Sequence, residues 1–424
     1  MTERLLQYIW KLQHFNHGNL RTVQDEPLRI LYPGRFNTHQ GPDFQEGKAL
    51  IGNTLWAGNI ELHVKTSDWK RHAHSEDANY RNVILHVVWE NDQKEEAPFG
   101  LPTLELAPRV SKLLLHRYRE LMTRQAFIPC ERALTDPPPA LLWSSWKDRM
   151  LAERLQRRAA AMENMLKENN GHWEEAFWWL IARSFGSRVN AEAFEAIARS
   201  IPSRLLSRHR QQPHQVEALL FGQAGLLQKP FEEAYPVMLQ REYAFLRHKY
   251  SLQPVSIPLH FLRMRPLNFP SVRLAQLAVL VAGPCRLFSK VLETKCLDEL
   301  EELLRVTAND YWHYHFSFDA PAAFRPKRLG REMVQNILIN TLIPVLYGYG
   351  AHYGYPEYID RALGWLWQLP PERNAIIRGW KGLELPPSNA FESQALLELR
   401  ANYCDGKRCL DCAVGNWIIG RATS

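Results

Sequence analysis

Acidic and basic side chains gather within residues 37–90 in a pattern that suits metal-assisted hydrolysis. Asp43 follows a Gly-Pro pair, and Glu61 is followed at two-residue intervals by His63 and Lys65. Carboxylates from two neighbouring strands can hold Mg²⁺ or Mn²⁺ through oxygen ligands. Such a cation activates water and stabilises the charge that builds on a phosphodiester, and a basic group beside it assists the water. These four residues are therefore candidate catalytic residues, with the two acids as metal ligands.

The histidines of the same stretch allow a second interpretation. His63, His72, His74 and Asp77 together could bind Zn²⁺ through nitrogen and oxygen ligands. Glu61 would then be the general base of a zinc hydrolase. A third interpretation is purely structural, with a plain turn before Asp43 and Glu61 as a solvated strand residue.

Three cysteines lie close together near the C-terminus. Cys404, Cys409 and Cys412 fall within nine residues, and soft thiolates at this spacing favour Zn²⁺ or an iron–sulfur cluster. Cys130 is the candidate fourth ligand, because it also lies beside an expected domain junction. Disulfides are not expected in a cytoplasmic chain.

A basic run later in the chain indicates contacts to nucleic acid. It combines arginine and amide side chains at the start of an expected helix, and these groups contact phosphates and bases. The candidates are Arg263, Arg265, Asn268, Arg273 and Gln276. An arginine-lined helix cap that packs on acidic neighbours explains the same run equally well. The arginines of 147–158 are expected on a solvated helix face.

Hydrophobic periodicity predicts the elements that position these residues. A helix is expected over 2–14, and strands over 28–32, 44–52, 60–66, 83–89 and 103–106, with a turn at 56–59. In 60–66 the apolar and polar side chains alternate, so Glu61, His63 and Lys65 share one face. Beyond residue 108 the pattern is helical, with prolines separating the segments. We expect an α/β domain over 1–108, a helical domain over 109–388, and a C-terminal helix with a cysteine knot over 389–424.

Composition places few limits on function. The chain has 424 residues, a formal net charge of +7 and 23% charged residues, which suits a cytoplasmic protein with a polyanionic partner. It contains no run of about 18 apolar residues, so no membrane span is expected. The N-terminus lacks the long apolar segment of a signal peptide.

The acidic stretch resembles the PD-(D/E)xK nuclease superfamily. The dipeptide Pro42-Asp43 corresponds to the family's first acid, and Glu61 to its second. The family's lysine position is occupied by His63, and Lys65 follows two residues later. The resemblance implies a restriction-endonuclease-like mixed sheet, and therefore an α+β protein overall. The arrangement of one upstream and three downstream cysteines resembles that of RecB-like nucleases with a four-iron four-sulfur cluster.

The whole chain also resembles an uncharacterised bacterial family of unknown function. The shared runs are those at 41–44, 58–63, 67–69, 72–74, 85–88, 268–270 and 273–276, together with the terminal cysteines. This resemblance implies no activity. The expected function is metal-dependent hydrolysis of DNA or RNA. The alternatives are the zinc hydrolase and a non-catalytic nucleic-acid-binding protein on a degenerate nuclease fold.

Overall fold

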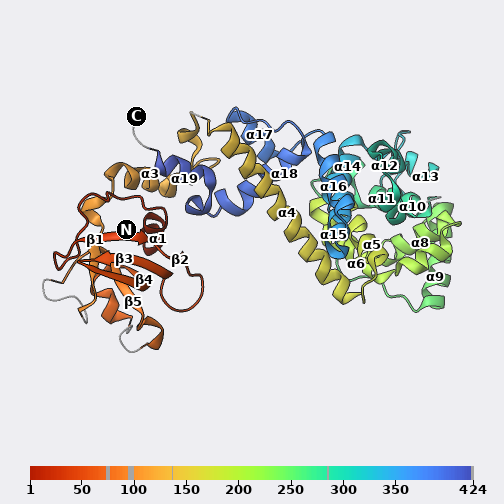
Figure 1. Cartoon of the computed structure of the whole chain (residues 1–424). Coiled ribbons are helices and arrows are strands. Elements are labelled where there is room, and N and C mark those ends of the chain that lie inside the picture. Colours follow the sequence, from red (N-terminus) through yellow and green to blue (C-terminus); the bar gives the residue numbers. More distant parts are fainter. Residues whose placement is uncertain (73–76, 94–99, 136, 284–285, 422–424) are drawn as a thin grey trace. The chain divides into compact units, whose positions relative to one another are not determined.

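The computed structural model describes residues 1–72, 77–93, 100–135, 137–283 and 286–421 (Figure 1). The chain divides into two compact units. The first unit comprises Met1–Trp146 and Leu399–Ser424, and the second comprises Lys147–Glu398. These two units are defined by which residues pack together. The domains over 1–108, 109–388 and 389–424 were inferred from the sequence pattern, and they stay a prediction.

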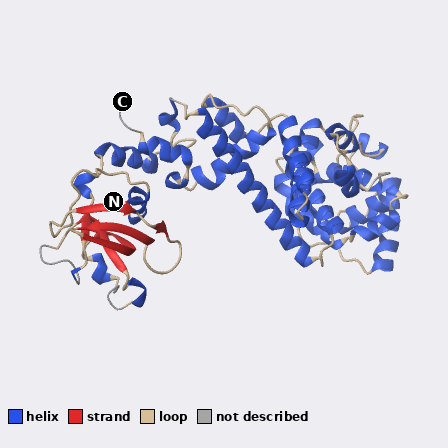
Figure 2. Ribbon diagram, viewed as in Figure 1, coloured by secondary structure: helices blue, strands red, loops and turns tan. Residues whose placement is uncertain are grey.

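The first unit is built on a mixed sheet, and Figure 2 shows the strands gathered there. In the described residues its strands are β1 (Leu28–Tyr32), β2 (Arg35–Phe36), β3 (Phe44–Ile51), β4 (Thr54–Lys65), β5 (Val83–Glu90) and β6 (Thr103–Glu105). Their order is β1-β3-β4-β5-β6, with β2 paired to β3. The pairs β1–β3 and β3–β4 are antiparallel, and β4–β5 and β5–β6 are parallel. The mixed sheet expected for the N-terminal part is confirmed.

The hairpin between β3 and β4 turns earlier than the sequence indicated. Ile51 pairs with Thr54, so the turn is Gly52-Asn53, and Gly52 has a φ of +58°. Two-residue hairpins favour glycine because it adopts positive φ without strain. The turn expected at 56–59 is therefore wrong, and those residues belong to a longer β4.

Helices close the sheet of the first unit. Its described helices are α1 (Glu3–Lys11), α2 (Asp68–Arg71), α3 (Lys112–Thr123), the start of α4 (Ala140–Glu168) and α19 (Ala413–Gly420), with short turns η1 (Ala78–Tyr80), η3 (Ala107–Arg109), η4 (Glu131–Thr135), η7 (Arg400–Cys404) and η8 (Cys409–Asp411). Thr2 caps α1, whose buried side chains include Leu6, Ile9 and Trp10. Because α1 packs against β4, both faces of the middle of β4 are covered.

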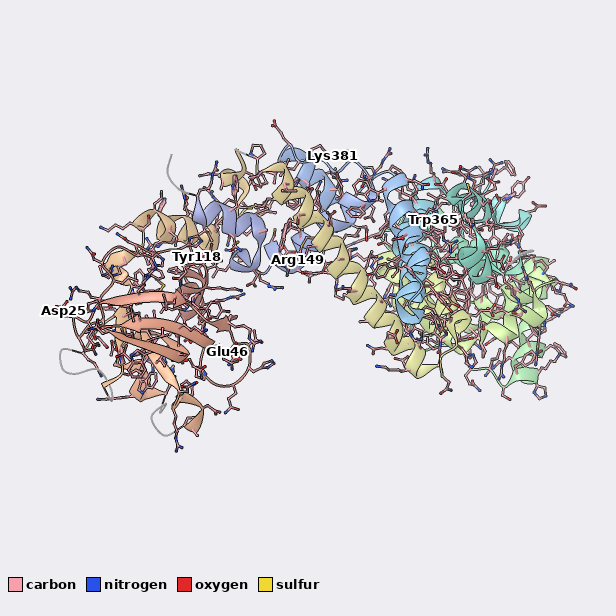
Figure 3. The ribbon with its side chains drawn as sticks, in the orientation of Figure 1. Asp25, Glu46, Tyr118, Arg149, Trp365 and Lys381 are labelled. Carbon is pink, nitrogen blue, oxygen red and sulfur yellow. The ribbon has the colours of Figure 1, made fainter. Side chains whose placement is uncertain are left out.

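In its described residues, the regular elements of the second unit are all helices. After α4 it contains α5 (Trp173–Phe185), α6 (Ser187–Ser200), α7 (Ser203–His209), α8 (Pro213–Gln223), α9 (Ala234–Tyr250), η5 (Pro266–Asn268), α10 (Pro270–Ala282), α11 (Leu287–Glu293), α12 (Leu297–Leu303), α13 (Asp310–His313), α14 (Arg331–Ile337), η6 (Leu338–Leu342), α15 (Ile343–Tyr353), α16 (Pro356–Gln368), α17 (Ala375–Gly382) and α18 (Ala390–Leu399). Trp365 of α16 is 2% exposed and belongs to its core (Figure 3). The α+β class is confirmed.

The arginines of α4 are less exposed than expected. Arg154 donates hydrogen bonds to Gln394 and Glu398, and Arg158 donates to the backbone and side chain of Asn340. Both arginines are half-buried. The expectation of a wholly solvated basic face is wrong, because part of α4 packs against other helices of the second unit.

The described residues contain no single helix with both the length and the apolar composition needed to cross a membrane. The bent pair of α10 and α11 meets that test only when its two helices are taken together.

Two helical glycines test how tightly the second unit is packed. A Cβ at Gly222 in α8 would lie 2.1 Å from a ring carbon of Tyr243, whereas a Cβ at Gly364 in α16 would meet no atom within 4 Å. We expect Gly222→Ala to lower the free energy of unfolding by about 2 kcal/mol or more, because the ring cannot yield without repacking. The matched Gly364→Ala is expected to raise it by about 0.5–1 kcal/mol through helix propensity. Urea unfolding measures both, and equal effects would contradict the packing described here.

Candidate active site

Asp43 and Glu61 meet through reciprocal hydrogen bonds between β3 and β4. The backbone N–H of Asp43 donates to Glu61 Oε2 at 3.0 Å, and the backbone N–H of Leu62 donates to Asp43 Oδ2 at 3.1 Å. Glu61 thus accepts a hydrogen bond from the backbone just before β3, and Asp43 accepts one from the backbone of β4. The antiparallel pairing of Phe44 with Ile60 places the two acids at this position.

The two carboxylates lie in a poorly solvated place. Glu61 is only 5% exposed, so the interpretation of it as a solvated strand residue is wrong. Burial, followed by the neighbouring charge of Asp43, holds the pKa of Glu61 well above its usual range. Burial and the charge of Glu3 raise the pKa of Asp43 as well. The pair therefore resists carrying two negative charges unless a cation offsets them.

Helix α1 supplies two residues that the sequence patterns did not single out. Gln7 donates from Nε2 to Asp43 Oδ1 at 2.8 Å and so helps to hold that carboxylate. Glu3 acts on both acids through its charge. Tyr80 is a third addition, because burial and then the charges of Glu61 and Asp43 raise its pKa to about 12. None of the three stands in a recognisable motif, because only packing brings them to the acids.

A chain of imidazoles extends from Glu61 along the same face of the sheet. His63 Nε2 lies 3.7 Å from Glu61 Oε1, and His63 Nδ1 lies 2.9 Å from His86 Nε2. His63 is 1% exposed, and the rings of Trp69 and His72 contact its ring, with centroids 6.1 and 5.1 Å away. His63 therefore lies between Glu61 and His86, hydrogen-bonded to His86 and within ion-pair distance of Glu61.

Other predicted residues of this stretch take different places. Lys65 is exposed at the end of β4, and its charge acts on Asp92. Its backbone N–H donates to Asp68. Asp77 caps η1 by accepting from the backbone of Asn79, and its charge also acts on Tyr80. His74 lies outside the described residues.

The donor set at Asp43 and Glu61 fits a hard divalent cation. Mg²⁺ is commonly held by one or two carboxylates, with waters and substrate oxygens completing its coordination. The raised pKa values of the two acids indicate a local need for positive charge. In the described part of the chain, no group of three or more His, Cys, Asp or Glu side chains is arranged to hold a metal ion. A cation here would therefore depend on waters and substrate as well as on these acids.

The four predicted cysteines lie near one another in the first unit. The pKa of the Cys404 thiol is raised mainly by burial. The nearby sulfurs of Cys130, Cys412 and Cys409 raise it further. Burial raises the pKa of the Cys412 thiol at the N-cap of α19, and the nearby backbone N–H groups of Gly415 and Val414 act in the opposite direction. Soft sulfur ligands of this kind are those that Zn²⁺ or an iron–sulfur cluster takes. Among the described side chains no three of these sulfurs converge as ligands.

The basic run of the second unit divides into an exposed and a buried part. Arg263 and Arg265 are exposed. Arg273 donates to Asn268 at 2.7 Å and to Gln276 at 3.0 Å, and Gln276 is buried and donates to the backbone of Lys327. Gln276 thus orients Arg273, and only the exposed residues of the run are open to a large partner.

The raised pKa values of the acid pair predict how stability depends on pH. A carboxyl group with a raised folded-state pKa binds more protons in the folded than in the unfolded state, so stability falls as pH rises above the unfolded value. We expect metal-free Glu61→Gln to be more stable than the wild type by about 1 kcal/mol or more near pH 8, and the gain to shrink near pH 5. Urea unfolding in EDTA at both pH values measures this difference. The matched control Glu90→Gln, at the exposed end of β5, should show little change, and a pH-independent gain in Glu61→Gln would contradict the prediction.

Comparison with known proteins places the chain in a family. Residues 3–375 match a family model described as a protein of unknown function, DUF2851. No curated protein and no solved structure matched the chain. The match confirms the expected family of unknown function, and the nuclease resemblance stays a prediction. Because the matched residues cover most of its length, this chain belongs to the DUF2851 family.

Proposed function

We propose that the first unit hydrolyses phosphodiester bonds of DNA or RNA with the help of Mg²⁺ or Mn²⁺. The observation that carries this proposal is the pairing of Asp43 and Glu61 through reciprocal backbone hydrogen bonds. Both acids have pKa values raised by burial and by neighbouring negative charge, and burying a carboxylate is costly for a fold. A cation-binding site accounts for that cost.

Each residue of the site has a role in this proposal. Asp43 and Glu61 would hold the cation, which polarises the phosphodiester and the attacking water when bound. His63 accepts a proton from water at Nε2, the nitrogen that lies beside Glu61. His86 holds the other nitrogen of His63 and so orients the ring. Gln7 keeps Asp43 in place. Asp43 is half-buried, so the pair is reached through its side of the site.

Nucleic acid is the proposed partner and the cytoplasm the proposed location. The net charge of +7 supports a polyanionic partner. The exposed Arg263 and Arg265 are the proposed contacts to its phosphates. The zinc alternative would use His63 Nε2 as a ligand, with His86 orienting the ring, so it competes with the proposed base for the same nitrogen. The non-catalytic alternative draws support from Lys65, which is exposed at the end of β4 and whose charge acts on Asp92, just after β5.

Cleavage assays test the proposed activity. Purified protein with Mn²⁺ is expected to cut single- or double-stranded DNA or RNA, and Glu61→Gln to lower the rate about a hundredfold or more, because it removes a charged metal ligand. The matched control Glu90→Gln should cleave as the wild type does. Nucleic-acid binding that weakens steeply with salt, without cleavage under any metal, would replace hydrolysis by the non-catalytic alternative.

Elemental analysis tests the proposed metal at the cysteines. Protein purified without oxygen is expected to contain either one zinc or about four irons per chain, and iron gives a brown colour. Cys409→Ser should lose the metal, because Cys409 is buried inside the cluster. Cys296→Ser is the matched control, since Cys296 is an exposed cysteine of the second unit. Wild-type protein without metal would contradict this part of the proposal.

A further inference from the structure

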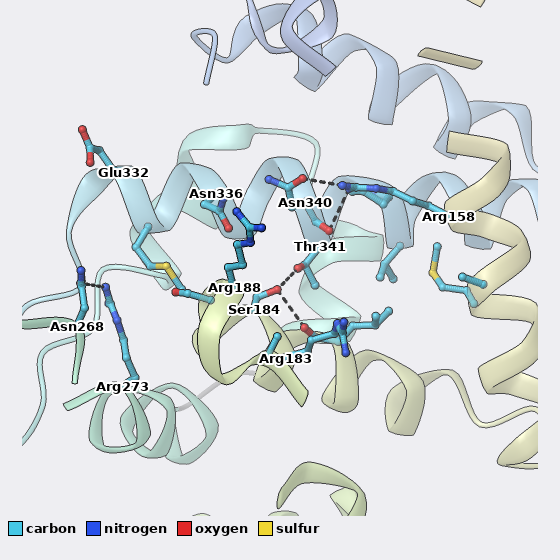
Figure 4. A pocket seen from close by; sticks show the side chains of 18 of the residues that line it. Arg158, Arg183, Ser184, Arg188, Asn268, Arg273, Glu332, Asn336, Asn340 and Thr341 are labelled. Atoms are coloured by element: carbon cyan, nitrogen blue, oxygen red, sulfur yellow. Dashed lines mark hydrogen bonds between the residues drawn. The ribbon is translucent and has the colours of Figure 1, made fainter. Parts of the chain in front are cut away.

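The second unit contains a pocket of about 670 Å³ (Figure 4). Its walls come from α4, α5 and α6, from the segment that leads into α10, and from α14, η6 and α15. All of these belong to the second unit, so the pocket is separate from the carboxylates of the first unit. Its volume lies in the range of about 300–1,000 Å³ that is usual for small-molecule sites.

The lining of the pocket is strongly basic. Glu332 is the one acidic residue among the described residues that line it. Five arginines line it as well: Arg158, Arg183, Arg188, Arg273 and Arg373. Arg183 pairs with Glu195, and Arg373 lies 3.8 Å from Glu332 with both side chains well exposed. The charge of the remaining arginines is not offset by such pairs, so the pocket favours an anion.

Arg273 is a buried arginine of this pocket whose hydrogen-bond partners are neutral amides. It is 9% exposed, and its Nη atoms donate to the neutral amides of Asn268 and Gln276. Within the described chain its Nε has no hydrogen-bond partner. Burial lowers the pKa of Arg273 to about 10, and no carboxylate acts in the other direction. A buried guanidinium held by neutral groups lacks its counter-charge.

Arg188 and Asn336 add free polar groups to the same pocket. Arg188 stands at the start of α6 and Asn336 in α14, and both are exposed. In the described part of the chain neither side chain makes a hydrogen bond or an ion pair. Figure 4 shows the Arg188 side chain pointing toward Asn336. A guanidinium forms two parallel hydrogen bonds to a phosphate, and an asparagine amide both donates and accepts.

The pocket also offers an apolar surface beside the basic groups. Four methionines line it: Met162, Met165, Met264 and Met333. Methionine side chains adapt their shape and contact aromatic rings favourably through sulfur. The ligand therefore needs an anionic group together with a flat or apolar portion.

We propose that this pocket binds a nucleoside phosphate, with its phosphates against Arg188 and Arg273 and its base against the methionines. Phosphate supplies the counter-charge that Arg273 lacks and forms paired hydrogen bonds with both guanidinium groups. Asn336 recognises a polar edge of the nucleoside. The ligand is small, because Arg273 and the orienting Gln276 are buried and a long polymer does not reach them.

Isothermal titration of the full chain tests this assignment, with ADP, GDP, CDP and UDP as probes. At least one of these nucleotides is expected to bind. The nucleoside of the same base, without its phosphates, and inorganic pyrophosphate should each bind at least about tenfold more weakly. Arg188→Gln and Asn336→Asp should each weaken that binding by about tenfold or more, because one loses a charged donor and the other adds a negative charge. Both residues are exposed, so the variants keep the core intact.

Two control variants make the result specific. Arg208→Gln removes the same charge from an exposed position of α7 outside the pocket, and its binding should equal that of the wild type. Glu61→Gln should also leave binding unchanged, which separates this pocket from the proposed hydrolytic site. No binding of any probe, equal weakening by Arg208→Gln, or pyrophosphate binding as tight as the best nucleotide would each overturn the proposal.

Discussion

The reciprocal hydrogen bonds between Asp43 and β4 are the constraint on which the first unit depends. They bind the start of β3 to the middle of β4 and keep two carboxylates where water is scarce. The fold satisfies the oxygens with backbone donors and the Gln7 amide, and burial raises the pKa of both acids. Carboxylates with perturbed pKa values gather at functional sites in proteins, which is why the proposed function is built on this pair.

The second unit contains both arginines that pair with a carboxylate and arginines that are held by neutral amides. On α4, Arg154 and Arg157 both pair with the buried Glu398 of α18. Arg158 and Arg273 are held by neutral amides instead. Paired arginines stabilise helix packing, whereas guanidinium groups that face a pocket with amide partners keep their charge available for an anionic ligand.

Much of the fold was predictable, and the failures have physical causes. The strands and most helices follow hydrophobic periodicity, which local burial imposes on the sequence. The turn predicted at 56–59 was wrong, because the positive φ that a tight hairpin requires falls at Gly52 and residues 56–58 pair with β3 instead. Alternation placed Glu61, His63 and Lys65 on one face, but it gave no sign that packing would bury Glu61 and His63 while Lys65 stays exposed.

The sequence by itself determined the family, the α+β class, and the residue types that can bind metal, because these follow from composition, spacing and periodicity. Only the tertiary structure decided which of those residues meet. It brought Asp43 to Glu61 and His63 to His86, left Lys65 at an exposed strand end, and added Glu3, Gln7 and the pocket around Arg188 and Arg273. The reason is physical: contacts between distant segments, and the burial that shifts a pKa, depend on how elements pack and leave no local pattern in the chain.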